Sequence, residues 1–423
     1  MISADEKRRL RALKKEQKRL EELEKGNSED ERRAKLFIRR PLLELPNKEQ
    51  FGKTFTIMSY NLLAQALIRR SLFPNNGDIL KWNKRSEALL AELTHYAADI
   101  MCLQEMDYIQ YNTFWNPELE KLGYSNRFYR SGTKNHGVAI FFRTSKFQLV
   151  DSTVIDYDQV PTANIVPRTN TLNVGLLVAL RPADDPSKLL IVGTTHLFWH
   201  PFGTYERTRQ TYIVLQETSK FEKSVQASHP DFEKSYKFFA GDFNSQPYDS
   251  PYLSIVQKPI KYNARCLKVI SCSAAYDYAD QEANTLETPV PEEFQPNEQQ
   301  EKLVHDMENL HNSLGTRAIS LYSLGYHLID PENAGLDNER NEPFFSNWAH
   351  TWRGLLDYIF FVTDWDFSDC TQLEQLEDFQ SKYGVLIKKL LKLPHPKEMN
   401  EGQPREGEYP SDHLCLMAEI ELK

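Results

Sequence analysis

The chain has 423 residues and a formal net charge of -9, which allows one large or two ordinary domains and argues against a generic nucleic-acid coat. No apolar run approaches the roughly 20 residues that span a bilayer, the N-terminus has no apolar signal core, and the five cysteines lack zinc-type spacing. We therefore expect an intracellular protein with free thiols and no membrane contact, in the cytoplasm, the nucleus or both.

The N-terminal segment differs in charge from the rest of the chain. Residues 1–40 hold 14 Lys and Arg against 9 Asp and Glu, so this segment is +5 and the remainder is -14. Residues 5–25 contain no Pro or Gly and predict a helix, which Gly26-Asn27-Ser28 ends. We expect residues 1–48 to form a charged arm that binds RNA or a protein partner or acts as a nuclear-import signal. A solvated helix without a partner is the alternative.

Strand and helix patterns then alternate through residues 49–423, which we expect to form one catalytic domain. Amphipathic helices are predicted over residues 84–97 and 207–221. Residues 171–181 and 189–195 flank the turn-rich PADDPSK and predict a hairpin. Further strands are predicted over residues 55–60, 99–104, 137–143, 236–240, 355–362 and 413–421. This mixture favours two packed mixed sheets with helices outside, in the α/β class. Residues 281–301, with six acids, three prolines and no Lys or Arg, are predicted to be an acidic loop insertion.

Two polar residues end predicted strands near the start of this domain. Glu105 follows the apolar stretch 100–103, where a carboxylate is costly to bury unless it meets a cation. Asn61 ends the strand in MSYNLLA. Carboxylate and amide oxygens are ligands that Mg²⁺ prefers. The alternatives are that Asn61 caps a turn and that Glu105 pairs with a lysine.

The tetrapeptide GDFN follows the strand-like KFFA. Asp242 and Asn244 are two apart on an extended chain and so project to one side. The carboxylate can position or deprotonate a water, and the amide can hold a phosphate oxygen. A turn without chemistry is the alternative.

Two histidines lie at predicted strand ends. His196 follows residues 191–195 and His413 follows Asp412. Beside the carboxylates they favour stabilisation of a pentacovalent phosphorane or protonation of its leaving group, although a lone histidine is more often structural. Asp357 in LLDYIFF can fix the tautomer of His413 or simply accept from backbone amides.

The motifs MSYNLLA, LQE, THLFWHP, GDFNSQP, LDYIF and SDH, in this order, resemble the exonuclease-endonuclease-phosphatase superfamily. The finer resemblance is to the deadenylase and nocturnin-like branch, especially the fungal Ngl-type RNA exonucleases, over residues 50–423. It implies a four-layered α/β sandwich of the deoxyribonuclease-I type. It also implies an enzyme that uses Mg²⁺, as one ion or two and with Mn²⁺ able to substitute, and that removes 5′-monophosphates from the 3′ end of single-stranded RNA.

The resemblance also implies roles for single residues. Glu105 would be the main metal ligand with Asn61 beside it, and Asp412 would support the metal shell. Asp242, Asn244 and His413 would hold a second metal or activate water. His196 would contact the scissile phosphate, and Asp357 would orient His413. In poly(A)-specific members a proline and a phenylalanine sandwich the terminal base, and Pro201 and Phe345 occupy the matching positions. The alternative for Phe345 is core packing.

Some features depart from that branch. No leucine-rich repeats precede the domain, His136 stands where relatives often have an acid, and the basic residues with which nocturnin grips a dinucleotide are replaced around residues 198–200. The first departure gives no ground for docking into the large deadenylase assembly, and the other two weaken strict poly(A) preference and dinucleotide 2′-phosphatase activity. We predict a 3′ to 5′ RNA exonuclease that prefers A-rich ends or trims RNA precursors. The alternatives are a phosphatase or phosphodiesterase on a small phosphorylated substrate, and a vestigial nuclease acting as a binding module.

Overall fold

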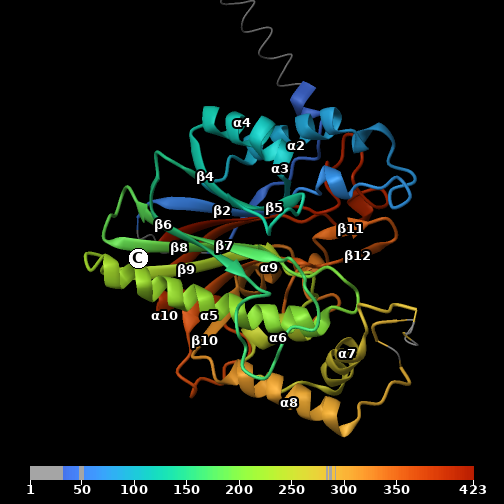
Figure 1. Cartoon of the computed structure of the whole chain (residues 1–423). Helices are drawn as coiled ribbons and strands as arrows, with labels where there is room; N and C mark the ends of the chain where they lie inside the picture. Colours follow the sequence, from blue (N-terminus) through green and yellow to red (C-terminus); the bar gives the residue numbers. More distant parts are fainter. Residues whose placement is uncertain (1–31, 47–51, 283, 285–287, 291) are drawn as a thin grey trace, which may run out of the picture.

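The computed structural model describes residues 32–46, 52–282, 284, 288–290 and 292–423. The helix predicted over residues 5–25 lies outside them. Two mixed sheets pack face to face, and helices cover the outer face of each, as Figure 1 shows. The predicted four-layered α/β sandwich is therefore confirmed.

The first sheet has the strand order β1-β14-β15-β2-β3-β5-β4. Only β2 and β3 pair in parallel, with Asn61 of β2 opposite Gln104 of β3. Its strands are β1 (Leu42–Glu44), β2 (Thr54–Asn61), β3 (Ile100–Asp107), β4 (Tyr124–Tyr129), β5 (His136–Arg143), β14 (Val385–Leu391) and β15 (Leu416–Leu422). The outer face is covered by α2 (Trp82–Tyr96), α3 (Tyr108–Gln110) and α4 (Asn116–Lys121) (Figure 1).

The second sheet has the strand order β10-β13-β9-β8-β7-β6. Its strands are β6 (Phe147–Asp156), β7 (Val174–Pro182), β8 (Lys188–His196), β9 (Lys234–Asp242), β10 (Thr316–Ser320) and β13 (Asp357–Asp364). The helices α5 (Thr204–Ser228), α6 (Ser250–Val256), α7 (Ala264–Ala275) and α8 (Glu298–Asn312) lie on its outer side (Figure 1). The remaining elements are α9 (Leu321–Ile329), α10 (Leu376–Tyr383) and a hairpin of β11 (Asn347–Ala349) and β12 (Trp352–Gly354).

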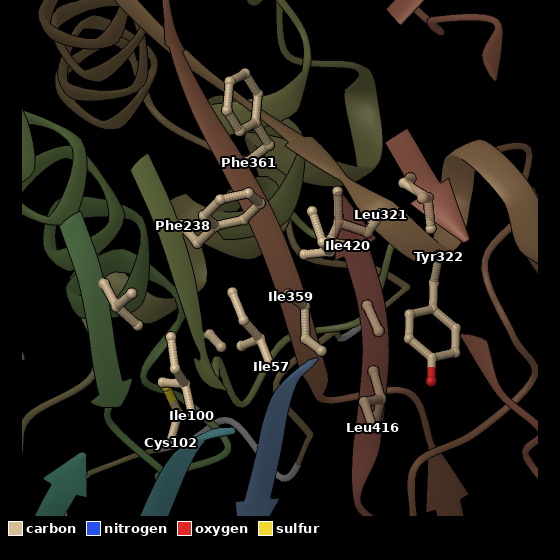
Figure 2. Packing of buried hydrophobic residues seen from close by; sticks show 14 of the residues in the cluster. Ile57, Ile100, Cys102, Phe238, Leu321, Tyr322, Ile359, Phe361, Leu416 and Ile420 are labelled. Carbon is tan, nitrogen blue, oxygen red and sulfur yellow. The ribbon is translucent and has the colours of Figure 1, made fainter. Parts of the chain in front are cut away.

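The main core lies between the two sheets. Figure 2 shows Ile57 and Ile100 of the first sheet near Phe238 and Ile359 of the second, and each of these side chains is fully buried. Alternate residues of β2 and β3 point the other way, where Met58 and other apolar side chains pack beneath α2. Both sheets are thus buried on two faces, and this explains why their strands read as apolar runs.

The predicted elements are found with shifted ends. The helix α5 is longer than residues 207–221, whereas β7 starts at Val174 because Leu172 adopts a left-handed φ of 52°. The predicted hairpin is confirmed, since β7 pairs antiparallel with β8. The prediction of a loop over residues 281–301 is wrong at its C-terminal end, where Asn297 and Gln300 form a capping box that starts α8.

The folded body begins before the expected arm boundary at residue 48. Phe37 and Arg40 are 3% and 5% exposed, and Leu42–Glu44 pairs with β14 as an edge strand. Along the described part of the chain, no helix combines the length and apolar character needed to cross a bilayer.

Candidate active site

Three site residues lie in one row across the second sheet. The strand register places His196 of β8 opposite Asp242 of β9, and Asp242 opposite Asp357 of β13. Directly paired residues project from the same face of a sheet, so these three side chains are neighbours. Asp242 and Asp357 are each 1% exposed. The sequence prediction that these motifs meet at one sheet edge is supported by the strand pairing itself.

The first sheet contributes Glu105 through an irregularity in β3. The pairing of β3 with β5 shifts register between Leu103 and Met106, and Glu105 between them has a left-handed φ of 53°. Such a conformation costs on the order of 1–3 kcal/mol in a non-glycine residue, and β-bulges often re-aim a side chain beside an active site. Glu105 Oε2 accepts from the Ala64 backbone N–H at 2.8 Å. Within the described residues it pairs with no lysine or arginine, so the simple ion-pair alternative is not seen.

Asn61 joins the two sheets. Its Nδ2 donates to Glu105 Oε1 at 3.2 Å and to Asp242 Oδ2 at 2.9 Å. Its Oδ1 accepts from the Leu63 backbone N–H at 3.0 Å. Both interpretations of Asn61 are therefore compatible with the structure, because one end of the amide caps the turn after β2 and the other end contacts two site carboxylates.

His413 lies against this row from the segment before β15. Its Nδ1 is 2.7 Å from Asp357 Oδ2, which also accepts from Ser346 Oγ at 2.7 Å, and its Nε2 is 3.6 Å from Asp242 Oδ2. Burial alone would lower the pKa of His413, but the carboxylates of Asp357 and Asp242 together hold it well above its usual value. Without a cation, the two carboxylates thus favour the protonated form of His413, and Asp357 fixes its orientation. The strand expected from residue 413 begins only at Leu416.

His196 has the opposite electrostatic character. Its Nε2 is 3.5 Å from Asp242 Oδ2 and its Nδ1 is 3.8 Å from Glu105 Oε1. Burial lowers the pKa of His196 to about 4, and the attraction of Asp242 only partly offsets this. The pKa values of the two imidazoles are thus shifted in opposite directions. Asn173, which the sequence analysis missed, donates its Nδ2 to the His196 carbonyl at 2.7 Å and so holds the end of β8.

Asn244 and Asp412 lie at the margins of the row. Asn244 has a left-handed φ of 46°, its backbone N–H donates to Asp242 Oδ1 at 2.9 Å, and its Nδ2 donates to the Leu197 carbonyl at 3.0 Å. Burial raises the pKa of Asp412 to about 6. Arg85, also missed, acts on Asp412 electrostatically and donates to the carbonyls of residues 62 and 63 at 2.6 and 2.5 Å.

The donor set fits a divalent cation. Ligand atoms of Asp242, Asp357 and His413 all lie within 4.8 Å of one another. Burial raises the pKa of Asp242, and Asp357 Oδ1 has no hydrogen-bond partner among the described residues. Buried carboxylates that outnumber their cationic partners are costly unless a further cation is present. Oxygen donors with few nitrogens suit Mg²⁺ or Mn²⁺.

The two residues expected to sandwich a base differ in accessibility. Pro201 is exposed in the loop after β8. Phe345 is 1% exposed and belongs to the main core, which corrects the expectation that its ring stacks on a base. The exposed aromatic residue of this segment is Trp352 on β12, at 47% exposure. A Cβ added at Gly354 would lie 2.8 Å from both the Trp352 ring and Gln246 Oε1, so the indole lies beside the segment that follows Asn244.

The comparisons with known proteins agree with this geometry. The model of the endonuclease/exonuclease/phosphatase family matches residues 58–413. RNA exonuclease NGL2 of Saccharomyces cerevisiae is 49% identical over 92% of this chain and 82% of its own length, and probable RNA exonuclease NGL3 of the same yeast is 38% identical over 91% and 82%. Among solved structures, ANGEL2, a 2′,3′-cyclic phosphatase, in complex with adenosine-2′,3′-vanadate matches with a TM-score of 0.61 and 24% identity over 91% of this chain and 99% of that one. The human nocturnin catalytic domain matches with a TM-score of 0.53 and 21% identity, over 91% and 98%.

Proposed function

Since the chain belongs to the endonuclease/exonuclease/phosphatase family, we propose that it is a metal-dependent exonuclease that shortens single-stranded RNA from its 3′ end. The observation that carries the proposal is the row His196, Asp242 and Asp357, which faces Asn61 and Glu105 of the other sheet. Water adds to the phosphorus of the terminal phosphodiester, the bond from phosphorus to the 3′ oxygen breaks, and a 5′-monophosphate leaves. The 49% identity to an RNA exonuclease supports RNA as the substrate.

The proposed ligands of the cation are Glu105, Asn61, Asp242, Asp412 and His413, around Mg²⁺ as one ion or two, with Mn²⁺ as a substitute. Such an ion neutralises phosphate charge and lowers the pKa of bound water. Asp357 Oδ1 is a further candidate donor, because it is buried without a partner in the described part of the chain. From the sequence, Asp357 was expected to orient His413 or to accept from backbone amides, and not to bind the cation.

The remaining roles depend on which side chains of the site carry a proton and which can accept one. His413, held at Nδ1 by Asp357, would offer an unprotonated Nε2 where it ligates the cation, and where it does not, its Nε2–H can donate to a phosphate oxygen. His196 is neutral and can hydrogen-bond the scissile phosphate without adding charge. The raised pKa of Asp242 suits acceptance of a proton from the attacking water. Asn244 would orient a nonbridging oxygen after its amide leaves the Leu197 carbonyl.

We further propose that Pro201 and Trp352, in place of Phe345, form the base platform. Both are exposed next to strands that end in site residues. Stacking of a base on an aromatic ring is worth roughly 1–3 kcal/mol and tolerates any base. A preference for A-rich ends would therefore be graded, and trimming of RNA precursors remains compatible with the same platform.

The charged arm and the cellular location are proposals as well. We propose that residues 1–31 add a modest, salt-sensitive contribution to RNA affinity or recruit a protein partner. Removal of these residues would then flatten the salt dependence of RNA binding, whereas an unchanged slope would refute the RNA-binding role. All five cysteines are free, which supports a reducing compartment, the cytoplasm or the nucleus.

The test is a time course on 5′-labelled RNAs of equal length that end in A, U, C or mixed sequence, with Mg²⁺ or with EDTA. We expect a ladder that shortens from the 3′ end only with Mg²⁺ and that Glu105→Ala abolishes. A ladder that is fastest on A supports the deadenylase-like preference, and one blind to base supports general trimming. No ladder, together with faster release of inorganic phosphate from small substrates, would replace this function by the phosphatase alternative.

A further inference from the structure

Three loops on the first sheet's side of the site form one continuous surface. They are the loop after Asn61, the turn after Glu105 and the turn that leads into His136. The Asp107 carboxylate accepts from the backbone N–H groups of residues 65 and 66, and the Tyr108 N–H donates to the Asn135 carbonyl at 2.8 Å. The first two loops continue strands that carry site residues, and at the third the ring centre of His136 lies 6.2 Å from that of His196, so this surface borders the active site.

This surface, called here the basic rim, is rich in exposed apolar and cationic side chains. Leu67, Tyr108 and Ile109 are 41%, 42% and 69% exposed, and Arg69 and Arg70 are exposed as well. The Arg130 guanidinium lies 3.8 Å from the centre of the Tyr108 ring. The rim consists of Leu67, Arg69, Arg70, Tyr108, Ile109 and Arg130.

The positive charge of the rim is not balanced locally. Among the described residues neither Arg69 nor Arg70 forms an ion pair, although the whole chain carries a net charge of -9. Asp107 uses its carboxylate on the two backbone N–H groups, and Asp78, on which Arg70 acts electrostatically, is paired with Lys81 at 2.9 Å. Unpaired arginines on an acidic protein raise the local concentration of polyanions.

We propose that the basic rim binds the RNA strand on the 5′ side of the nucleotide that is removed. This inference rests on the proposed function. Arg69 and Arg70 contact backbone phosphates, and a base stacks on the Tyr108 ring that Arg130 orders. Cations interleaved with an exposed aromatic ring and aliphatic side chains are the combination with which proteins hold single strands without reading their sequence.

The consequence is a dependence on substrate length. A dinucleotide occupies only the site and the platform of Pro201 and Trp352, whereas a 20-nucleotide RNA also reaches the rim. Removal of positive charge from the rim therefore weakens the binding of long substrates and leaves the binding of a dinucleotide unchanged. It does so equally for A-rich and U-rich strands, because phosphate contacts do not depend on the base.

The test compares the double variant Arg69→Gln/Arg70→Gln with the wild-type protein on a 20-nucleotide RNA and on the dinucleotide ApA. Both arginines are exposed and unpaired, so folding is preserved. We expect the ratio of kcat/KM for the long over the short substrate to fall on the order of tenfold. The slope of binding against salt should fall by roughly 0.7 for each lost phosphate contact.

The matched control is Lys53→Gln/Lys223→Gln, which removes two exposed charges at the opposite end of the molecule. Lys53 precedes β2, whose other end is Asn61, and Lys223 lies near the far end of α5. An unchanged ratio in the rim variant, or an equal fall in the control, would overturn the proposal. If wild-type protein cleaves neither RNA, the proposed function fails; binding of the labelled 20-nucleotide RNA, which needs no cleavage, then still decides the role of the rim.

Discussion

Two groups of buried charged residues, one beneath α2 and one in the active site, differ in how their charges are satisfied. Beneath α2, Arg40 Nη2 is 3.6 Å from Glu92 Oε1, and the Tyr60 hydroxyl donates to Glu92 Oε2 at 2.7 Å. Arg40 also donates to the carbonyls of residues 392 and 415. In the active site, by contrast, Asp357 Oδ1 has no partner among the described residues, although burial raises the pKa of Glu92 and of Asp242 alike.

The first group of charged residues stabilises the fold, whereas the second is available to bind a cation and substrate. The cluster beneath α2 pairs each acid oxygen with a donor, so the loss of one partner leaves an uncompensated buried charge. The active site keeps carboxylates without enough partners, and this is the arrangement expected where a cation and a substrate supply the rest. Substitutions in the two clusters should therefore have opposite effects on activity and stability.

The largest effect is expected for Asp242→Asn. The rate of RNA hydrolysis should fall by a factor of about 10³, because a proton acceptor and cation ligand is lost at the centre of the site. The protein without metal should be about as stable as wild type, since the removal of a buried charge offsets the loss of the acceptor for Asn61 Nδ2, while Oδ1 still accepts from the Asn244 N–H. Single-turnover kinetics and urea denaturation in EDTA measure the two quantities. A rate within about tenfold of wild type would contradict the assignment.

For Arg40→Met we expect a loss of stability without a loss of activity. Removal of one partner of a buried ion pair should lower the free energy of unfolding by about 3–5 kcal/mol, with activity per folded molecule unchanged. Urea denaturation and active-site titration at low temperature check this. As a control, Arg40→Met/Glu92→Leu should recover much of the lost stability, because no charge is then buried. A double variant as unstable as the single one would mean that packing, and not charge, explains the loss.

Glu342 is an intermediate case, a buried acid with one donor. Tyr252 donates to its Oε1 at 2.8 Å, its Oε2 has no partner in the described part of the chain, and burial raises its pKa from 4.5 to about 7. The folded state therefore holds a proton that the unfolded state releases, and stability should fall by about 3 kcal/mol as the pH rises from about 4.5 through about 7.

Glu342→Gln carries no titratable group and should lose this part of the pH dependence. Denaturation midpoints of wild type and variant at several pH values between these limits measure the difference. Parallel curves for the two proteins would show that Glu342 is already ionised in the folded state.

The smallest effect is expected at the base platform. Trp352→Ala should raise KM for A-ended RNA by about tenfold, since one stacking contact is lost, and should leave stability nearly unchanged because the ring is 47% exposed. Phe345→Ala should instead destabilise the protein by about 3–5 kcal/mol, as expected for a phenylalanine in a core. Steady-state kinetics on RNAs with different 3′ bases, together with denaturation, separate these outcomes. An equal KM for Trp352→Ala and wild type would remove Trp352 from the platform.

The sequence predicted most of what depends on periodic patterns. The apolar strands, their order and the polar residues at their ends were sufficient to group Asn61, Glu105, Asp242 and His196 at one edge. The strands β4, β6, β10 and β14 were not predicted, and neither were the three-residue strands β1, β11 and β12, because a pattern needs more residues than these three offer. For the same reason the sequence did not show that β12 exposes Trp352.

Other site features depend on tertiary contacts that leave no local signal. Arg85 bonds to the Pro410 carbonyl, 325 residues away, and Asn173 bonds to the His196 carbonyl, 23 residues away. The left-handed Glu105 arises from a register shift against β5, in a segment whose composition favours a regular strand. Phe345 was assigned by its position next to LDYIF, and position alone does not distinguish a buried from an exposed aromatic ring.

We propose that a divalent cation completes the active-site carboxylates, of which Asp357 Oδ1 has no partner among the described residues. Isothermal titration of the wild-type protein and of Asp242→Asn with Mg²⁺, repeated with Mn²⁺, tests it most directly. We expect each ion to bind the wild type saturably and to bind the variant far more weakly or not at all. Equal binding to both proteins, or no binding of either ion to the wild type, would contradict it.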